Sequence, residues 1–413
     1  MITLPKINNQ YSARPKILVA PLDWGLGHAT RCIPIIKELL NNTCEVWIAA
    51  SGDQKALLKE EFPLLSFVEI PGYEIKYGKN RASTLLKLIG SIPKILIRIK
   101  QEKEWLKGFL ALEKPDAVIA DNRYGLYAPG LYSVLITHQL GIKTSFGKIA
   151  DLILRRVHYR MINRFSRCWV PDFGGGLDSL AGDLSHPGKL PLIPTRYIGP
   201  LSRFEKTRPA AGTSGGPEAA MAGGPGARPE GPGAGMPSCD LLILLSGPEP
   251  QRTIFERLLL EQLASYPGSA ILVRGLPGTS ATGPQIPDGA PDRTGKGIPP
   301  GVKVYDHLPA KELNVAMAGA GIVISRAGYS TIMDLVKLGK RSILVPTPGQ
   351  TEQEYLGKYL SGRKVALRVR QSDFSLVDAL AKANNFPFTM IGGGGEELLG
   401  KEVAALLKCL AGR

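Results

Sequence analysis

Residues 322–355 place small side chains, a carboxylate and a polar run at a spacing that suits a phosphorylated ligand. Residues 325–328 form a predicted turn, where small side chains let a phosphate approach the backbone. The helix that follows, which Ser330 or Thr331 can cap, presents its N-terminus to the anion. Asp334, about two turns into that helix, can accept hydrogen bonds from a ribose diol. The stretch therefore predicts a nucleotide site; the alternative is a plain structural unit with a solvated polar loop.

A glycine-rich loop at residues 21–31 contains a second candidate, His28. An imidazole at a loop-to-helix junction can take a proton from a sugar or lipid hydroxyl near neutral pH. Alternatively, His28 only caps the helix or orients the loop. Asp23 could instead be the base or could orient His28, although an aspartate in a turn is more often a local cap. A dinucleotide fingerprint would have a third glycine where Thr30 stands, so no nicotinamide site is expected.

Further polar residues follow two predicted strands of the first half. Asp121, Asn122 and Arg123 follow strand 117–120, and His138 follows strand 134–137. If the sheet is parallel, these residues converge on the rim that holds His28. They are candidates for binding an acceptor, and the alternative is that they cap loops.

Hydrophobic runs predict the elements that position these residues. Strand 16–20, helix 32–40 and strand 45–50 have the order that begins a doubly wound sheet. Strands 322–324 and 341–345 flank a helix that Gly339 ends, which makes a βαβ unit. Ligands of such sheets bind at the carboxyl ends of the strands, where the candidate residues lie.

A third small-residue turn follows the strand at residues 240–245. Backbone N–H groups at Ser246 and Gly247 would cradle a diphosphate, with Arg252 as the counter-charge. Pro248 removes one N–H donor from this turn.

The stretch 322–355 resembles the donor-binding signature of GT-B glycosyltransferases of the family 28 type. The likeness is strongest to the lipid II-forming N-acetylglucosaminyltransferases and the diacylglycerol galactosyltransferases, and it covers most of residues 15–205 and 238–380. It implies an α/β fold of two Rossmann-like doubly wound domains facing a cleft. It also implies transfer of a hexose or N-acetylhexosamine from a UDP-sugar to a hydroxyl of a lipid or lipid-linked glycan, by a metal-independent inverting displacement.

The resemblance also gives individual residues their expected roles. Asp334 would hold the uridine ribose, Gln353 would face the donor sugar, and backbone at Leu308 would read the uracil edge. Glu354 stands where the relatives have a second glutamine, which leaves the sugar open. The sequence around His28, GLGH with a following arginine, is similar to a first-loop motif beside the acceptor.

These arguments give three groups of predicted site residues. The predicted catalytic residues are His28 and Asp23. The predicted donor-binding residues are Ser246, Gly247, Arg252, Leu308, Arg326, Ala327, Gly328, Asp334, Gln353 and Glu354. The predicted acceptor-binding residues are Gly25, Gly27, Arg31, Asp121, Asn122, Arg123 and His138.

Composition bounds the class of protein. The 413 residues carry a formal charge of +15, which suits nucleic acid, an anionic membrane or phosphorylated substrates. Aromatic residues make up only 7% without a basic-aromatic platform, which argues against nucleic acid. The five cysteines are scattered, so disulfides are not expected. No Asp-x-Asp motif is present, so no essential metal is expected. No cofactor is expected besides the UDP-sugar, which would be the donor substrate.

The chain has no apolar run long enough to span a membrane and no signal-peptide core near its first residue, which predicts a cytoplasmic location. Segment 84–110 is basic and amphipathic, which favours peripheral contact with the inner face of the cell membrane. The alternative is an ordinary helix with solvated lysines.

The predicted division of the chain follows from these segments. Residues 1–204 form the acceptor-binding domain, 205–238 a disordered Gly/Ala/Pro-rich linker, and 239–383 the nucleotide-sugar domain. Residues 384–413 contain a last helix that can cross back to the first domain. Two rival functions remain: a nucleotide-sugar epimerase, and a non-catalytic protein that binds sugar nucleotides on the same fold.

Overall fold

The computed structural model describes residues 14–73, 92–143, 147–176, 178–205, 238–247, 249–276, 298, 301–391 and 395–412. The predicted linker lies outside the described residues except at its two ends, as do Pro248 and the part of segment 84–110 that precedes residue 92.

The first half of the chain forms a seven-stranded parallel sheet with the strand order β3-β2-β1-β4-β5-β6-β7. Its strands are β1 (Lys16–Pro21), β2 (Glu45–Ala49), β3 (Ser66–Val68), β4 (Ala117–Asp121), β5 (Tyr132–Ile136), β6 (Arg167–Val170) and β7 (Thr195–Tyr197). The order reverses between β1 and β4, where Pro21 pairs with Asp121 at the carboxyl ends of both strands. Such a switch point is where open α/β sheets bind ligands.

The second half repeats this design in a six-stranded parallel sheet with the order β10-β9-β8-β11-β12-β13. Its strands are β8 (Leu241–Leu244), β9 (Ala270–Val273), β10 (Val302–Tyr305), β11 (Ile322–Ser325), β12 (Ser342–Leu344) and β13 (Leu367–Arg368). The switch point lies between β8 and β11, where Leu244 pairs with Ser325. The residues after β8 and after β11 therefore share one rim.

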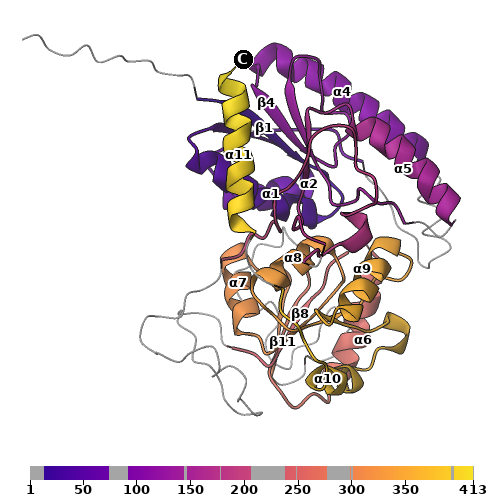
Figure 1. Cartoon of the computed structure of the whole chain (residues 1–413). Coiled ribbons are helices and arrows are strands. Elements are labelled where there is room, and N and C mark those ends of the chain that lie inside the picture. The colour runs from indigo at the N-terminus through magenta and orange to yellow at the C-terminus, as the bar shows by residue number, and fades with distance from the viewer. Residues whose placement is uncertain are drawn as a thin grey trace, which may run out of the picture.

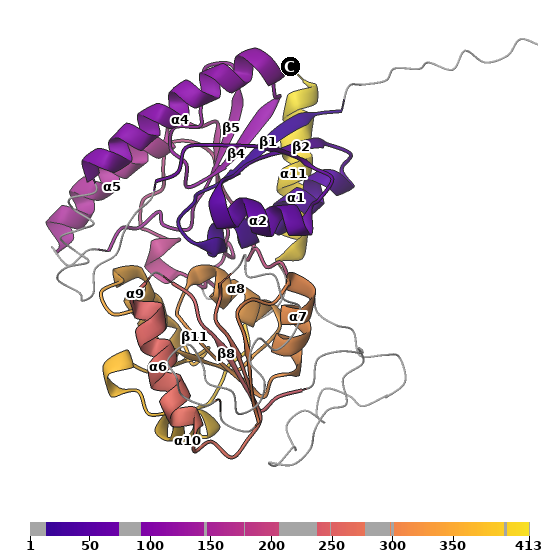
Figure 2. The same cartoon turned by 180° about the vertical axis from the view of Figure 1, so that it is seen from behind.

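Helices cover both sheets (Figures 1 and 2). In the first half they are α1 (Leu26–Asn41), α2 (Gly52–Glu61), α4 (Ile92–Glu113) and α5 (Lys148–Ile162), with a 3₁₀ turn at Gly182–Leu184. In the second half they are α6 (Gln251–Leu263), α7 (Ala310–Gly319), α8 (Tyr329–Lys337), α9 (Thr351–Gly362), α10 (Leu376–Asn384) and α11 (Glu396–Ala411), with a 3₁₀ turn at Gln371–Asp373. Helices α4 and α5 lie side by side in both views.

The two halves share a continuous hydrophobic core. Helix α1 packs against α8 of the second half and against the last helix, α11. Leu356 of α9 and Val403 and Leu406 of α11 are fully buried in the same cluster as Ile36 of α1. Figure 1 shows α11 running along the first half, next to α1. The two rims are therefore held facing each other by packed helices.

Two local predictions need correction. Helix α1 begins at Leu26 rather than at residue 32, so His28 and Arg31 lie in its first turns. Helix α8 begins at Tyr329 with Gly328 at its N-cap position, and no side chain caps it. Its end agrees with the prediction, because Gly339 adopts a φ of 63° just beyond it.

Candidate active site

The N-termini of α1 and α8 meet where the two sheets face each other. Gly27 leaves no room for a Cβ because the hydroxyl of Ser330 fills that space. Gly25 precedes α1 with a φ of 81°, which favours glycine, and its carbonyl accepts a hydrogen bond from Gln54 (2.7 Å). The first turn of each helix therefore presents backbone N–H groups to this junction, an arrangement that favours anions.

His28 stands at this junction beside a buried carboxylate. Its Nδ1 lies 2.9 Å from Oδ2 of Asp121, whose side chain is fully buried while that of His28 is 16% exposed. The pair forms because β1 and β4 are neighbours, which brings the start of α1 next to Asp121. Within the described residues, no hydrogen bond involves Nε2 of His28.

Arg31, one turn further along α1, completes the cluster. Its Nε donates to Oδ2 of Asp121 (2.7 Å), its Nη2 donates to Oδ1, and Nη2 also lies 2.8 Å from Nδ1 of His28. A guanidinium only donates and a carboxylate only accepts, so Nδ1 can serve one of them at a time. When Nδ1 carries its hydrogen and donates to Asp121, the lone pair is on Nε2, the nitrogen a base would use.

The pKa values of the cluster are set by burial and by Arg31. Burial and the Arg31 charge lower the pKa of His28, and Asp121 acts in the opposite direction. Burial alone would raise the pKa of Asp121, but Arg31 and His28 lower it to about 2. At neutral pH the site therefore holds an ionised aspartate beside a neutral imidazole, which is the state in which a histidine accepts a proton.

Asp23 does not contact His28. Its Oδ2 accepts the backbone N–H of Tyr73 (2.7 Å), and its Oδ1 lies 3.7 Å from Nη2 of Arg123. The group that orients His28 is thus Asp121, which the sequence placed among the acceptor contacts. Asp23 instead ties the loop after β1 to the segment around Tyr73, the local role given to it as the alternative.

Arg123 and Asn122 also differ from their predicted places at the acceptor rim. Arg123 is fully buried and donates to the carbonyl of Pro21 (2.6 Å) and to Glu102 (2.9 Å). Its charge is therefore paired with a carboxylate inside the first half. Asn122 adopts a φ of 52°, and its amide, oriented to satisfy its neighbours, donates to Oγ1 of Thr137 (2.9 Å). Both side chains hold the strand ends together.

On the opposite rim, Asp334 is buried and already has a partner. Its Oδ1 accepts a hydrogen bond from the hydroxyl of Ser202 (2.6 Å), which lies on the segment that leaves the first half. Burial raises the pKa of Asp334 to about 6, although Arg203 and Ser202 act to lower it. One oxygen of the residue predicted to hold the ribose is therefore occupied by the Ser202 hydroxyl.

The polar run at the start of α9 braces the loop before it. Gln353 Oε1 accepts the N–H of Thr347 (2.8 Å), and Glu354 Oε1 accepts that of Gly349 (3.2 Å). Ser246 and Gly247 are exposed, and Gly247, with a φ of 99°, approaches the side chain of Thr347. The turn after β8 and the loop before α9 therefore lie next to each other at one rim.

The two arginines predicted to meet a diphosphate are turned inward. Arg252 pairs with Glu249 and with Glu256 (2.7 Å to each). Arg326 is 1% exposed, donates to the carbonyl of Gln251 (2.8 Å) and lies over the ring of Phe255. Neither guanidinium faces the junction, so among the described residues the candidate anion-binding groups at this rim are backbone N–H groups. The side chains of Leu308 and Ala327 are also buried.

One contact that the sequence did not single out crosses the junction. Glu352, in the first turn of α9, lies 2.8 Å from Nε2 of His138, which follows β5. Tyr329, the first residue of α8, stacks on His138 with ring centroids 4.0 Å apart. The polar run 350–354 was the only sequence signal for Glu352.

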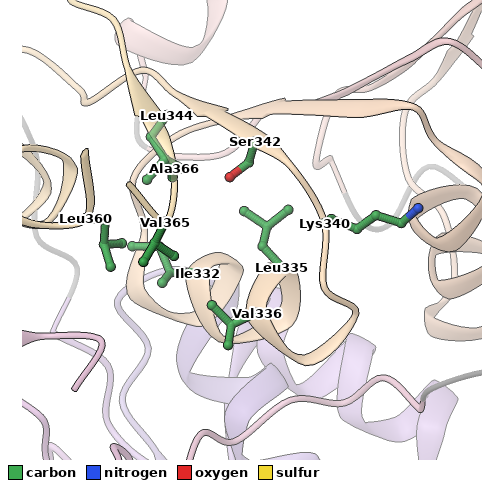
Figure 3. A pocket seen from close by; sticks show the side chains of 9 residues that line it. All are labelled: Ile332, Leu335, Val336, Lys340, Ser342, Leu344, Leu360, Val365 and Ala366. Carbon is green, nitrogen blue, oxygen red and sulfur yellow. The ribbon is translucent and has the colours of Figure 1, made fainter. Parts of the chain in front are cut away.

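A small cavity behind α8 is not part of this site. It measures about 20 Å³ and is lined by nine residues, mostly apolar, of which Ile332, Leu335 and Val336 belong to α8 (Figure 3). This is room for about one water molecule. Among the described residues, no cluster of histidine, cysteine and carboxylate side chains could hold a metal ion.

Comparisons with known proteins show what this chain is similar to. Residues 295–390 match the glycosyltransferase family 28 C-terminal domain. An uncharacterized glycosyltransferase of Methanosarcina acetivorans is 25% identical over 354 residues, which cover 82% of this chain and 81% of that protein.

A second relative is the UDP-N-acetylglucosamine--N-acetylmuramyl-(pentapeptide) pyrophosphoryl-undecaprenol N-acetylglucosamine transferase of Bradyrhizobium sp. (strain BTAi1). It is 39% identical over 82 residues, but the match covers only 17% of this chain and 22% of that enzyme. The shared part is thus a short one.

Among solved structures, the glycotransferase of kitacinnamycin superposes with a TM-score of 0.61 at 15% identity, covering 96% of this chain and 99% of that one. The spinosyn rhamnosyltransferase SpnG in complex with thymidine diphosphate gives a TM-score of 0.56 at 15% identity, covering 96% and 100%. These likenesses concern the fold, and they confirm the predicted pair of Rossmann-like sheets.

Proposed function

Because this chain is a GT-B glycosyltransferase of the family 28 type, we propose that it moves a hexose or N-acetylhexosamine from a UDP-sugar to a hydroxyl of a lipid or lipid-linked glycan. The observation that carries the proposal is the His28–Asp121 pair, placed where the N-terminus of α1 meets that of α8. This arrangement sets a base of the first half against an anion-binding rim of the second.

The pair supports a direct displacement. Nε2 of His28 takes the proton of the acceptor hydroxyl while the acceptor oxygen attacks the anomeric carbon, and the bond from that carbon to the diphosphate oxygen breaks. The electron pair of that bond leaves with the diphosphate, so the configuration at the anomeric carbon inverts. Asp121 accepts the Nδ1 hydrogen of His28 and stabilises the imidazolium that forms.

The leaving diphosphate would be stabilised by the second half without a metal. Backbone N–H groups at Gly328 and at Ser246 and Gly247 lie at the switch point between β8 and β11. A helix N-terminus supplies about half a positive charge to such an anion. Arg252 and Arg326 are buried and hydrogen-bonded within the second half, so we do not assign them a contact with the ligand.

The donor nucleotide would be held by its ribose. Asp334 would exchange the Ser202 hydroxyl for the ribose diol, and Gln353 would face the sugar beyond the diphosphate. The solved neighbour with thymidine diphosphate suggests a second donor class, whose deoxyribose offers one hydroxyl fewer. Asp334 favours UDP, because two ribose hydroxyls give a carboxylate two hydrogen bonds.

A lipid acceptor would be reached through α4 and α5. Leu96 and Ile97 of α4 are 56% and 57% exposed, and Ile149 and Ile153 of α5 are 78% and 55% exposed. Basic residues of the same two helices accompany them: Lys94, Arg98, Arg155, Arg156 and Arg160. Apolar side chains among basic ones suit an anionic membrane surface. No helix among the described residues is long and apolar enough to cross a membrane.

A release assay separates the proposal from its rivals. The protein is incubated with UDP-sugars and with dTDP-sugars, with and without lipid acceptors, and free nucleotide and sugar are measured. UDP release only in the presence of a lipid acceptor is the expected result. Release of an epimerised donor would instead identify an epimerase, and tight UDP binding without any turnover would identify a binding protein.

A further inference from the structure

Glu352 reaches from the second half into the first. Its Oε1 accepts a hydrogen bond from Nε2 of His138 (2.8 Å), and its other oxygen accepts one from the side chain of Gln139. His138 and Gln139 follow β5, whereas Glu352 begins α9, which also carries Gln353 and Glu354. The loop that faces the predicted donor site is therefore tied directly to the half that holds the predicted base.

His138 is clamped in one orientation. The ring of Tyr329 stacks on it with centroids 4.0 Å apart and an angle of 12° between the planes. The hydroxyl of Tyr329 donates to the carbonyl of Pro171 (2.7 Å), which fixes that ring in turn. The side chain of His138 is only 4% exposed. An imidazole held this way keeps both nitrogens aimed at their partners.

The second nitrogen of His138 meets Arg31. Nη1 of Arg31 lies 3.4 Å from Nδ1 of His138, and a guanidinium can only donate. Nδ1 therefore accepts, and Nε2 carries the hydrogen that it donates to Glu352. The contacts continue from Arg31 to Asp121 and from Asp121 to His28. One hydrogen-bonded chain thus runs from Glu352 to His28 across the junction.

We propose that Glu352 is a positioning residue for the proton transfer at His28, acting through His138 and Arg31 from the opposite half of the molecule. This inference rests on the proposed function, in which His28 is the base. Its consequence is that the base has its full strength only while α9 is docked on the first half.

The charges around His28 fix the direction of the effect. The groups that interact with it are Arg31 of α1, Asp121 of β4, His138 after β5 and Glu352 of α9. Glu352 stabilises the positive charges of Arg31 and of protonated His28. Removing the negative charge of Glu352 leaves the positive charge of Arg31 less compensated. Because a nearby positive charge disfavours protonation, the pKa of His28 should fall.

The test compares Glu352→Gln with the wild type. Glutamine keeps the shape, and its amide oxygen can still accept from His138, so the variant removes the charge and the one hydrogen bond from Gln139. The acid limb of the profile of kcat/KM against pH should move to lower pH, and kcat should fall about tenfold because a weaker base accepts the proton less readily. UDP affinity should stay within about twofold of the wild type, since the predicted ribose and diphosphate contacts are untouched. Glu397→Gln, an exposed carboxylate of α11, is the matched control and should change neither.

A titration without turnover separates this inference from the proposed function. The imidazole resonances of His28 are followed by NMR as pH is varied, in the wild type and in Glu352→Gln. A lower midpoint in the variant supports the coupling, and if the wild type proves inactive with every donor, only the proposed function fails. An unchanged His28 midpoint, or an increase in donor KM with an unchanged pH profile, would overturn the coupling.

Discussion

His28 is partly buried and Asp334 is buried, and their surroundings shift their two pKa values in opposite directions. Burial and Arg31 lower the pKa of His28, which keeps the imidazole neutral and able to accept a proton. Burial raises the pKa of Asp334 to about 6, so its carboxylate predominates only above about pH 6. Each prediction at this scale depends on one of these two environments.

Asp121→Asn tests the pair that carries the proposed function. An amide has one accepting oxygen where the carboxylate has two, so it cannot accept from both His28 and Arg31 in the same way, and it no longer balances the Arg31 charge. Loss of a positioned acid–base partner should lower kcat by about a hundredfold to ten-thousandfold. UDP binding, measured by calorimetry, should not change. The control is Asp116→Asn, an exposed carboxylate that accepts the backbone N–H of Lys16. Equal kcat values for Asp121→Asn and wild type would remove Asp121 from the mechanism.

Asp334 makes stability depend on pH in a defined direction. Its pKa rises from 3.8 to about 6 on folding, so folding favours the protonated form. That contribution is complete below about pH 4 and is lost as pH rises through about 6. Asp334→Asn removes this pH dependence of stability. The free energy of unfolding of the variant minus that of the wild type should therefore increase from pH 4 to pH 7, by about 3 kcal/mol at most.

Urea unfolding at several pH values measures this difference. If the free energies of unfolding of the two proteins change in parallel with pH, the raised pKa of Asp334 is contradicted.

The same carboxylate gives a second prediction, because its ionised form would accept hydrogen bonds from the ribose diol. UDP affinity of the wild type should therefore increase as pH rises through about 6, and that of Asp334→Asn should be weak and flat.

At the scale of elements, the sequence predicted the strands and helices far better than the directions of side chains at their ends. A strand such as Ile322–Ile324 can be predicted from its own short stretch of sequence, because buried parallel strands are rich in β-branched residues. Arg326, two residues further on, looked like a phosphate ligand. Its actual partners, the carbonyls of Gln251 and Val345 and the ring of Phe255, come from distant segments that only the folded sheet brings together.

The His28–Asp121 pair shows the same limit. Both residues were selected from the sequence, but for different roles. Their contact follows from the pairing of β1 with β4, which are about a hundred residues apart. A local pattern did exist for the contact surface of α9. Glu352, Tyr355, Tyr359 and Arg363 recur at the spacing of one helical face, and all four contact the first half.

Helices α4 and α5 supply the element-scale prediction. Ile153→Glu places a carboxylate in the exposed apolar face of α5, where it would have to be desolvated near lipid phosphates. Binding to vesicles that contain anionic lipid, followed by sedimentation, should fall about tenfold. Val377→Glu on α10 is the matched control, because Val377 is 73% exposed in the other half. Equal loss in both variants would show that charge repulsion alone acts and that α5 does not face the membrane.

At the scale of the whole molecule, the two sheets are joined by shared packing. One hydrophobic cluster includes α1, α8, α9 and α11, and α11 returns from the second half to the first. Glu402 of α11 pairs there with Arg167 of β6 (3.1 Å). This packing holds α9 against the first half, which is the condition under which Glu352 reaches His138.

Leu406→Ala tests whether α11 joins the two halves energetically. Leu406 is fully buried in the shared cluster, and truncating such a leucine leaves a cavity that costs about 2–5 kcal/mol. If the halves unfold together, calorimetry should show one transition shifted to lower temperature. UDP should still bind at low temperature, because α11 does not contribute to the donor rim. Leu112→Ala, at an 82% exposed position of α4, is the control and should leave the transition unchanged. Two separated transitions in the wild type would mean that the halves are independent, and the link from Glu352 to His28 would then be a contact that opens and closes rather than a fixed part of the site.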